Sequence, residues 1–261
     1  MNASGEQPLR VVLTGASRGI GRALALELAR AKAHVLLNAR GAEALEQVAQ
    51  QVEAAGGCAL VVAGDLTHEP TRQAIFGQVE QHWGALDVLI NNAGVGALGP
   101  FLEANPQRLR QVMELNLFAA AEMIRLGVAY LELGRDPAVV NIGSILSYVP
   151  LPMMPEYTAS KFALRGLSEA VRPELVERGI HLLVVHPATT DTEFFDSVLE
   201  QRRDTPWRSR RPVSPEAVAR RTLRALKKRK KELFPDAGSW CLYRVARWLP
   251  GGVRWMLSRR Y

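Results

Sequence analysis

The chain has 261 residues, of which 48% are hydrophobic, and this length and composition suit one α/β domain with a substantial core. The N-terminus lacks the apolar run of a secretion signal, and no stretch approaches the roughly 18 apolar residues of a membrane-spanning helix. Two distant cysteines, Cys58 and Cys241, exclude a disulfide framework and indicate a reducing compartment, so a cytoplasmic protein is expected.

Short apolar runs alternate with helix-like stretches along most of the chain. The predicted strands are 9–13, 34–37, 58–63, 88–90, 138–142 and 181–185. The predicted helices are 22–31, 42–55, 73–82, 105–133, 156–178 and 215–228. Runs that are apolar throughout, rather than alternating, are typical of a parallel sheet buried on both faces. The pattern predicts a Rossmann-like, doubly wound parallel sheet of about seven strands in a single domain over 1–236, with an amphipathic basic appendage over 237–261.

A glycine-rich turn joins the first predicted strand to the first predicted helix. Gly15 would permit a tight turn, Gly19 would let the backbone approach a pyrophosphate, and Gly21 would let the helix pack closely on the strand. A phosphate would then lie at the positive end of the helix. The alternative is that the glycines serve the turn alone. The candidate cofactor contacts in this turn are Gly15, Ser17, Arg18, Gly19, Ile20 and Gly21.

The end of the second predicted strand carries no carboxylate. A site for NAD usually has one there to bind the ribose 2′-hydroxyl, whereas this strand ends in Asn38-Ala39-Arg40. Arg40 and Arg18 are placed to bind a 2′-phosphate instead. The sequence therefore favours NADP(H) over NAD(H), and the alternative is that both arginines are only solvated surface residues.

Polar residues also follow the third and fourth predicted strands. Asp65-Leu66 and Asn92-Ala93-Gly94 lie at carboxyl ends of strands, where ligands bind in open α/β sheets. We expect Asp65 to contact an adenine amino group. The preceding Asn91 is expected to brace the sheet at least in part.

Tyr157 and Lys161 are four residues apart, which places a phenol and an ammonium on one face of a helix. A free tyrosine has a pKa near 10, too high for a base at neutral pH. A cation at about 4 Å in an effective dielectric of about 20 contributes about 4 kcal/mol, before desolvation opposes it. The spacing therefore predicts that Lys161 lowers the pKa of Tyr157 into the range of a general acid/base.

Two further polar residues complete a known pattern. Ser144 follows the strand at 138–142 and Asn116 lies within the helix at 105–133. Together with the glycine turn and the Asn-Asn-Ala-Gly run, they make residues 9–195 resemble the short-chain dehydrogenase/reductase family. The resemblance implies that Ser144 holds the substrate oxygen and Tyr157 exchanges its proton. It also implies that Lys161 binds the nicotinamide ribose, that Asn116 supports a water relay, and that the protein forms a homodimer or homotetramer.

One loop departs from the family pattern. After the sixth predicted strand the family commonly has Pro-Gly, whereas this chain has Pro187-Ala188. Alanine restricts the backbone more than glycine does. Cofactor contacts are still expected from Pro187, Thr190 and Thr192, and His186 is assigned to the strand end. No His or Cys cluster has the spacing of a metal site, so no metal is expected.

A substrate lid is predicted over about 191–212. Its apolar residues favour a lipophilic carbonyl or alcohol substrate, although they are equally suited to packing the lid shut. These residues are Phe194, Phe195, Val198, Leu199 and Trp207.

The last part of the chain differs in charge from the rest. Residues 202–261 contain 18 Lys and Arg against 4 Asp and Glu, whereas residues 1–201 contain 15 against 22. Three of the five tryptophans, interleaved with arginines, fall within 237–261, a combination typical of peripheral membrane segments. The alternatives are docking on a partner subunit or on the protein's own core. The charges would also suit nucleic acid, but the tryptophans favour a membrane face.

Three hypotheses follow. The first is an NADP(H)-dependent oxidoreductase that transfers hydride to or from the carbonyl or alcohol carbon of a lipophilic substrate, with Tyr157 as acid/base. The second is an NAD-dependent secondary-alcohol or steroid dehydrogenase. The third is a non-catalytic, cofactor-binding membrane scaffold.

Overall fold

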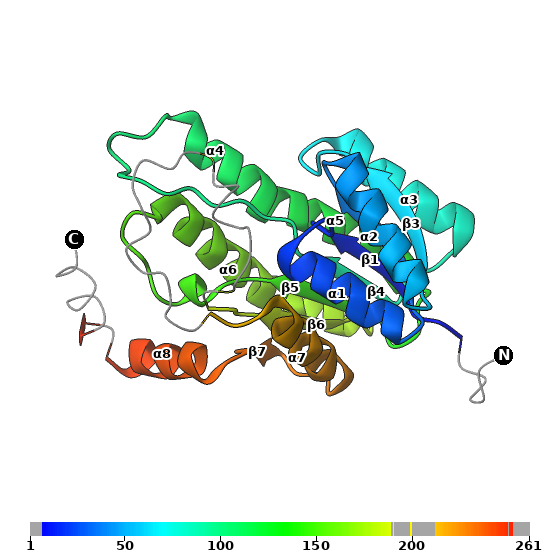
Figure 1. The fold of residues 1–261 in the computed structure, drawn as a ribbon. Helices are drawn as coiled ribbons and strands as arrows, with labels where there is room; N and C mark the ends of the chain where they lie inside the picture. Colours follow the sequence, from blue (N-terminus) through cyan, green and yellow to red (C-terminus); the bar gives the residue numbers. More distant parts are fainter. Residues whose placement is uncertain (1–6, 189, 191–198, 200–211, 250, 253–261) are drawn as a thin grey trace.

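Within the described residues, seven parallel strands form one sheet with helices on both faces (Figure 1). The computed structural model describes residues 7–188, 190, 199, 212–249 and 251–252. The strand order is β3-β2-β1-β4-β5-β6-β7. The strands are β1 (Arg10–Thr14), β2 (His34–Ala39), β3 (Cys58–Ala63), β4 (Val88–Asn91), β5 (Ala138–Ile142), β6 (His181–Val185) and β7 (Glu232–Leu233). The predicted doubly wound sheet is therefore confirmed.

Helices connect the strands and cover the sheet. They are α1 (Gly19–Arg30), α2 (Ala42–Ala54), α3 (Glu69–His82), α4 (Gln107–Met113), α5 (Ala120–Leu131), α6 (Pro155–Glu177), α7 (Pro215–Lys227) and α8 (Ala237–Trp248). Two further segments are a π-helix, η1 (Glu114–Ala119), and a short 3₁₀ turn, η2 (Ile145–Ser147).

Two hydrophobic clusters form the core, one on each face of the sheet. Successive side chains of a strand point to opposite faces, so Val11 and Leu13 of β1 join one cluster and Val12 joins the other. The first cluster includes buried residues of α1, α2 and α7, and the second includes buried residues of α3, α5 and α6. Each strand of the sheet centre is therefore buried on both sides, which explains the continuous apolar runs in the sequence.

The order of the strands reverses between β1 and β4. The chain runs from β1 outward to β2 and β3, then returns to β4 on the other side of β1. In such a sheet the connections on either side of this point leave in opposite directions, and a crevice opens at the carboxyl ends of the strands. The fold therefore places the β1–α1 turn and the end of β4 at the rim of a ligand site.

Several elements differ from the prediction, and three of the differences are informative. Helix α3 starts at Glu69 instead of 73, because Pro70 in its first turn is compatible with a helix start. The single helix expected over 105–133 is α4, η1 and α5 in succession. Strand β7 was not predicted, because two residues carry no periodicity signal. Among the residues described, no helix combines the length and the apolar character that crossing a bilayer requires.

Candidate active site

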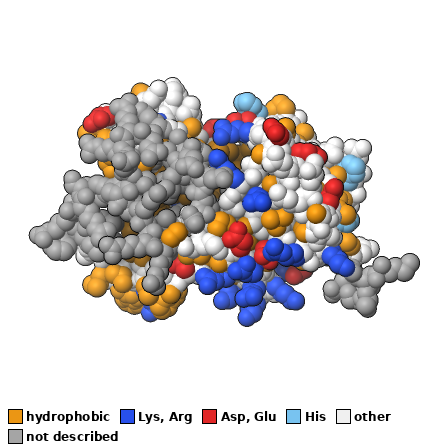
Figure 2. All heavy atoms as spheres, viewed as in Figure 1, with side chains coloured by type: hydrophobic (Ala, Val, Ile, Leu, Met, Phe, Trp, Pro, Cys, Tyr) orange, Lys and Arg blue, Asp and Glu red, His pale blue; other side chains and the backbone are white. Residues whose placement is uncertain are grey.

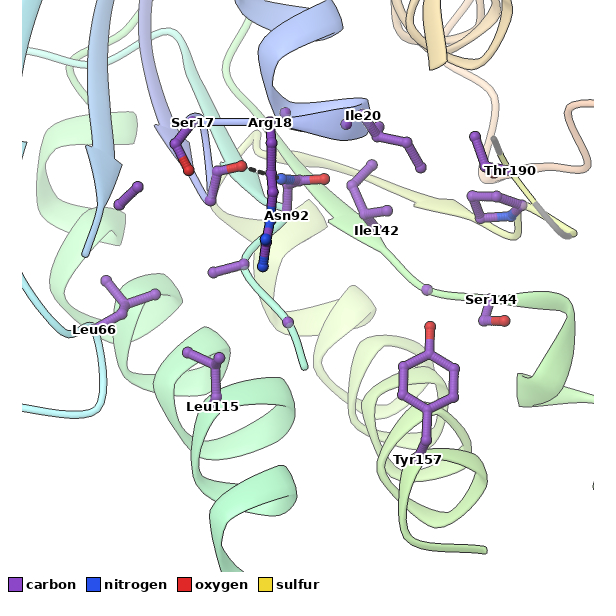
Figure 3. A pocket seen from close by; sticks show the side chains of 18 of the residues that line it. Ser17, Arg18, Ile20, Leu66, Asn92, Leu115, Ile142, Ser144, Tyr157 and Thr190 are labelled. Atoms are coloured by element: carbon purple, nitrogen blue, oxygen red, sulfur yellow. Dashed lines mark hydrogen bonds between the residues drawn. The ribbon is translucent and has the colours of Figure 1, made fainter. Parts of the chain in front are cut away.

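A cavity of about 600 Å³ lies at the carboxyl ends of the strands (Figure 3). Its volume is within the usual range of small-molecule and cofactor sites. The predicted residues that line it are Gly15, Ser17, Arg18, Gly19, Ile20, Gly21, Arg40, Asp65, Leu66, Asn92, Ala93, Gly94, Ser144, Tyr157, Lys161, Pro187 and Thr190. The structure thus brings together residues from seven separate segments of the chain. Thr192 lies outside the described residues.

The glycines of the β1–α1 turn are needed where they are. Gly15 and Gly19 have φ values of +64° and +52°, which L side chains rarely adopt. A Cβ on Gly21 would lie 2.0 Å from the Gly15 carbonyl oxygen. Arg18 precedes α1 and makes no capping hydrogen bond, so the first N–H groups of the helix face the cavity and suit an anion. The turn therefore fits a pyrophosphate.

The end of β4 is joined to this turn. The Asn92 amide nitrogen donates to the carbonyl oxygens of Thr14 and Gly15, at 3.0 and 2.9 Å. In return, Thr14 Oγ1 accepts from the backbone nitrogens of Asn92 and Ala93, both at 3.0 Å. The β1–α1 turn and the end of β4 are thereby joined into one wall of the cavity (Figure 3).

The charges near the predicted adenosine end are mixed. Arg18 and Arg40 are exposed and line the cavity, with Asp65 on the neighbouring strand end. Desolvation opposes ionisation of Asp65, but hydrogen bonds from Thr67 and the charge of Arg40 together lower its pKa. Asn38 of β2 lies two residues before Arg40, and its side-chain amide donates to Val62 O of β3 at 2.9 Å, so it serves the fold.

Ser144 and Tyr157 meet at the other end of the cavity. Ser144 follows β5 and its hydroxyl accepts from Leu146 N at 3.1 Å, which starts η2. Tyr157 lies in the first turn of α6, and its hydroxyl points toward Ser144 (Figure 3). Two hydroxyl groups therefore converge on one point of the cavity wall.

Lys161 lies one turn beyond Tyr157 and is buried. Its Nζ is 5.6 Å from the centroid of the Tyr157 ring and donates to Ile142 O at 2.9 Å. Burial lowers the pKa of Lys161 to about 8. Burial also raises the pKa of Tyr157 to about 12, and the hydrogen bond with Ser144 only partly offsets this. Burial therefore shifts the pKa of Tyr157 in the direction opposite to the one predicted from the Lys161 spacing.

Asn116 does not line the cavity but braces its wall. It lies in the π-helix η1, and its amide donates to Val95 O and to Ser160 Oγ, both at 2.9 Å. Its Oδ1 accepts from Val95 N at 2.8 Å. A Cβ on Gly94 would lie 3.2 Å from Asn116 Oδ1 and 3.6 Å from Lys161 Nζ. Asn116 thus connects the loop after β4 to α6, and the water relay stays a prediction.

Asn91 braces the sheet, as its position suggested. Its amide donates to Asn141 Oδ1 at 3.0 Å, and the Asn141 amide donates to Ser168 Oγ at 2.9 Å. These buried bonds connect β4, β5 and α6 beneath the cavity.

Several cavity residues were missed by sequence reasoning. The most informative are apolar residues beside Tyr157, namely Leu146, Leu151 and Met154. The apolar segment that precedes Tyr157 was the available signal. Of the apolar residues assigned to the lid, only Leu199 is described, and it packs against Val95, Ala97 and Val112. Phe194, Phe195, Val198 and Trp207 lie outside the described residues.

Comparison with known proteins places this geometry in a family. The sequence model described as "short chain dehydrogenase" matches residues 10–203, about three quarters of the chain. The chain belongs to the short chain dehydrogenase family. The predicted resemblance is thereby confirmed, and so, at the level of the family, is the predicted class: oxidoreductases that act on CH–OH and C=O groups.

Two curated members of the short chain dehydrogenase family illustrate the range of similarity. "Ketoacyl reductase HetN" of Nostoc is 35% identical over 177 residues, covering 68% of this chain and 62% of its own. "Probable oxidoreductase EphD" of Mycobacterium tuberculosis is 29% identical over 260 residues, covering 94% of this chain. The chain spans only 44% of the length of EphD.

Solved short chain dehydrogenase structures share the fold and contain nicotinamide cofactors. A protein of Burkholderia cenocepacia, in complex with NADP, is 25% identical with a TM-score of 0.81, covering 96% of this chain and 98% of its own. One from Burkholderia phymatum, in complex with NAD, is 24% identical with a TM-score of 0.84, covering 92% and 93%. One of these neighbours thus contains NADP and the other NAD.

Proposed function

We propose that this protein is an NADP(H)-dependent oxidoreductase that transfers hydride between the nicotinamide and the carbonyl or alcohol carbon of a lipophilic substrate, with Tyr157 as the acid/base. One observation carries the proposal. The Tyr157 and Ser144 side chains face each other in the same cavity as the glycine turn (Figure 3).

The residues of this chain have distinct tasks in a reduction. When bound, the cofactor supplies the hydride. Ser144 donates a hydrogen bond to the substrate carbonyl oxygen and so orients the carbonyl. Tyr157, with its pKa raised to about 12, is protonated at neutral pH and gives its proton to the developing alkoxide oxygen.

A lipophilic substrate is supported by the walls around Tyr157. Leu146, Leu151 and Met154 line the cavity there, and Leu115 adds a further apolar side chain. We therefore expect aliphatic ketones and aldehydes, such as 2-decanone, 1-decalone and decanal, to be reduced in preference to short polar ones. The alternative, an NAD-dependent dehydrogenase, would use the same catalytic residues. It would differ in that Arg40 binds no 2′-phosphate. The scaffold hypothesis leaves the convergence of Ser144, Tyr157 and Lys161 without a purpose.

Substitution of Tyr157 tests the proposal. Tyr157→Phe removes the only proton that the phenol can give and keeps the ring, so kcat with the best compound of that panel should fall about 10²–10⁴-fold. NADPH binding, followed by fluorescence, should change little. Tyr130→Phe is the matched control, because that hydroxyl is on the surface and bonds Glu80. Full turnover by Tyr157→Phe, or no turnover of any panel compound by the unaltered protein, would refute the proposal.

We also propose a homodimer or homotetramer, as in the family expectation. The helices α4 and α5, with η1 between them, carry the exposed side chains Leu109, Phe118 and Leu126. Apolar side chains that follow one another along a helical surface are suited to a subunit interface. Sedimentation equilibrium measures the state directly, and a monomer at micromolar concentration would rule the oligomer out.

We further propose that α7 and α8 contact an anionic membrane surface. The outer side of α8 exposes Trp240, Val245, Trp248 and Leu249, and Trp248 is 72% exposed. Arg244 stacks over Trp240 at 5.3 Å, so a cation borders the apolar side chains. Such an arrangement is typical of helices that lie in the plane of a membrane.

Helix α7 supplies charge beside this apolar patch. Figure 2 shows the hydrophobic side chains of α8 and a cluster of Lys and Arg over α7 along the same edge of the molecule. Arg221 of α7 and Trp240 of α8 line one shallow surface hollow, so the two patches are continuous. The exposed cations of α7 are Arg220, Arg221, Arg224, Lys227 and Lys228. A continuous apolar and basic surface suits anionic phospholipid better than a protein partner.

Flotation with vesicles tests the membrane proposal. The protein should float with vesicles that contain one-third phosphatidylglycerol and much less with pure phosphatidylcholine. Trp240→Ala with Trp248→Ala should abolish flotation. Arg224→Glu with Lys228→Glu should weaken it at least about tenfold, because each basic residue near the surface is worth about 1 kcal/mol. Leu102→Ala, which alters an exposed apolar residue elsewhere, is the control. Absence of flotation of the unaltered protein would exclude the contact.

A further inference from the structure

His186 follows β6 and is completely buried beneath the catalytic end of the cavity. Its Nδ1 lies 3.3 Å from the carbonyl oxygen of Ser144. Its Nε2 lies 3.3 Å from Oε1 of Glu232, which is the first residue of β7. The imidazole therefore bridges the serine assigned to the substrate oxygen and a carboxylate at the edge of the sheet.

Both partners of this imidazole are hydrogen-bond acceptors. A backbone carbonyl can only accept, and an ionised carboxylate can only accept. Hydrogen bonding by His186 and Tyr148 outweighs desolvation and lowers the pKa of Glu232, so this carboxylate is ionised at neutral pH. The ring nitrogens of His186 therefore each face an acceptor group, the Ser144 carbonyl on one side and the Glu232 carboxylate on the other.

Groups from four elements surround this pair. Tyr148, next to η2, donates its hydroxyl to the same Glu232 oxygen. Phe234, just after β7, stacks on the imidazole with centroids 5.0 Å apart. The other titratable or charged side chains around Tyr148 are Arg165 of α6, 4.1 Å from its ring centroid, and Tyr243 of α8, in an edge contact at 4.7 Å. Aromatic rings thus pack around the buried imidazole, whereas the Glu232 side chain stays 31% exposed.

The backbone around Ser144 is pinned on both sides. Gly143 N donates to Val185 O and Ile145 N donates to Pro187 O, each at 2.8 Å. Between these two bonds the Ser144 carbonyl accepts from Ser147 N at 2.9 Å and from His186. The orientation of this peptide decides where the Ser144 hydroxyl lies relative to Tyr157.

We propose that His186 and Glu232 are positioning residues, which hold the Ser144 peptide so that its hydroxyl meets the Tyr157 phenol. The imidazole holds the Ser144 carbonyl, Glu232 orients the imidazole, and Tyr148 holds Glu232 through its hydroxyl. This assignment rests on the proposed catalytic role of Ser144. It gives β7, a strand of two residues, a task in the site.

A double-mutant cycle with Ser144 separates positioning from general structural support. Glu232→Gln keeps the size of the side chain and removes the charge. His186→Phe keeps an aromatic ring and removes the two ring nitrogens. Each should lower kcat for the best panel compound about tenfold, with the dissociation constant of NADPH unchanged. In a Ser144→Ala background the same changes should lower kcat less than about twofold, since residues that act through one group are not additive. Tyr148→Phe, which removes one hydrogen bond and keeps the ring, should show the same pattern with a smaller loss, and it serves if the others do not fold.

The contact between His186 and Glu232 provides a readout that is independent of activity. Nitrogen NMR of the full chain should identify the ring signals of His186, among those of the five histidines, by their loss in His186→Phe. Glu232→Gln should shift the Nε2 signal of His186, because that nitrogen contacts the Glu232 carboxylate.

The outcomes distinguish this inference from the proposed function. Losses that multiply in the Ser144→Ala background, or an Nε2 signal of His186 that is unchanged in Glu232→Gln, would overturn the positioning role alone. If Ser144→Ala and Tyr157→Phe both retain full turnover, the proposed function fails first. If those two lose turnover while Glu232→Gln and His186→Phe keep it, only the positioning role fails.

Discussion

Arg40 stands at the end of β2, where a carboxylate would bind a ribose 2′-hydroxyl. Together with Arg18 it lines the cavity, and Asn38 beside it is occupied with a backbone bond to Val62. Asp65 is the nearest carboxylate and follows β3, with its Oδ1 already accepting from Thr67 N at 2.9 Å. The positive charge at this end of the cavity is therefore available to a 2′-phosphate.

Charge reversal at this position tests the cofactor preference. Arg40→Asp should raise KM for NADPH about 10–100-fold, because a charge-assisted hydrogen bond to phosphate is worth about 1.5–3 kcal/mol and a carboxylate repels the phosphate. KM for NADH should stay the same or fall. Arg110→Asp, an exposed arginine of α4 outside the cavity, should change neither value. An unchanged preference for NADPH in Arg40→Asp would remove Arg40 from the site.

At the scale of elements, a buried ion pair connects α4 to the start of α6. Arg108 donates to Glu156 Oε1 through Nε at 2.8 Å and through Nη2 at 2.6 Å. The two side chains are 2% and 1% exposed, and Glu156 immediately precedes Tyr157. The pair therefore fixes the turn of α6 that presents the phenol, at the desolvation cost that any buried pair incurs.

Removing one partner of this ion pair should lower the free energy of unfolding more than replacing both partners with apolar residues. Arg108→Met leaves a buried, unpaired carboxylate, so the free energy of unfolding should fall by about 3–5 kcal/mol. Arg108→Met with Glu156→Met removes both charges and should recover most of that loss. Urea denaturation of the two variants measures the difference. Equal losses in the single and the double variant would show that packing, and not charge, dominates at this contact.

At the scale of the whole molecule, the buried Lys161 makes stability depend on pH. Its pKa is about 8 in the folded protein, against an ordinary value of 10.5. Below pH 8 the folded state confines an ammonium that the unfolded chain would solvate. Between pH 8 and 10.5 the folded state has lost this proton while the unfolded chain keeps it, so this contribution to stability rises with pH.

Comparison with Lys161→Met isolates this effect. The free energy of unfolding of the unaltered protein, relative to Lys161→Met, should rise by on the order of 3 kcal/mol across that window. The raised pKa of Tyr157 acts in the opposite direction above pH 10 and is present in both proteins. Chemical denaturation at several pH values measures the difference. If the difference in free energy of unfolding between the two proteins stays constant from pH 8 to 10.5, then burial does not lower the pKa of Lys161.

The whole molecule also joins its C-terminal helix to the catalytic end of the cavity. Tyr243 of α8 stacks on Phe234 with centroids 4.5 Å apart and meets the edge of Tyr148, which lies next to η2. The exposed side of the same helix carries the tryptophans assigned to the membrane. The boundary drawn at 236 stays a prediction, as does the lid over 191–212, most of which lies outside the described residues.

The sequence alone determined the alternation of strands and helices, the glycine turn and the phenol–ammonium spacing. Each of these depends on neighbouring residues, through buried apolar runs, allowed φ values and the helical repeat. It also placed almost all of the predicted cavity residues correctly, because carboxyl ends of parallel strands meet at one edge of a sheet.

Only the tertiary structure decided how those residues behave. The direction in which the pKa of Tyr157 shifts depends on how deeply the ring is buried. The four-residue spacing to Lys161 carries no information about that burial. Asn116 braces the cavity wall through its hydrogen bonds with Val95 and Ser160. His186 contacts Glu232, which lies 46 residues further along the chain. Burial and distant partners arise when separate segments pack together, so no local pattern could have shown them.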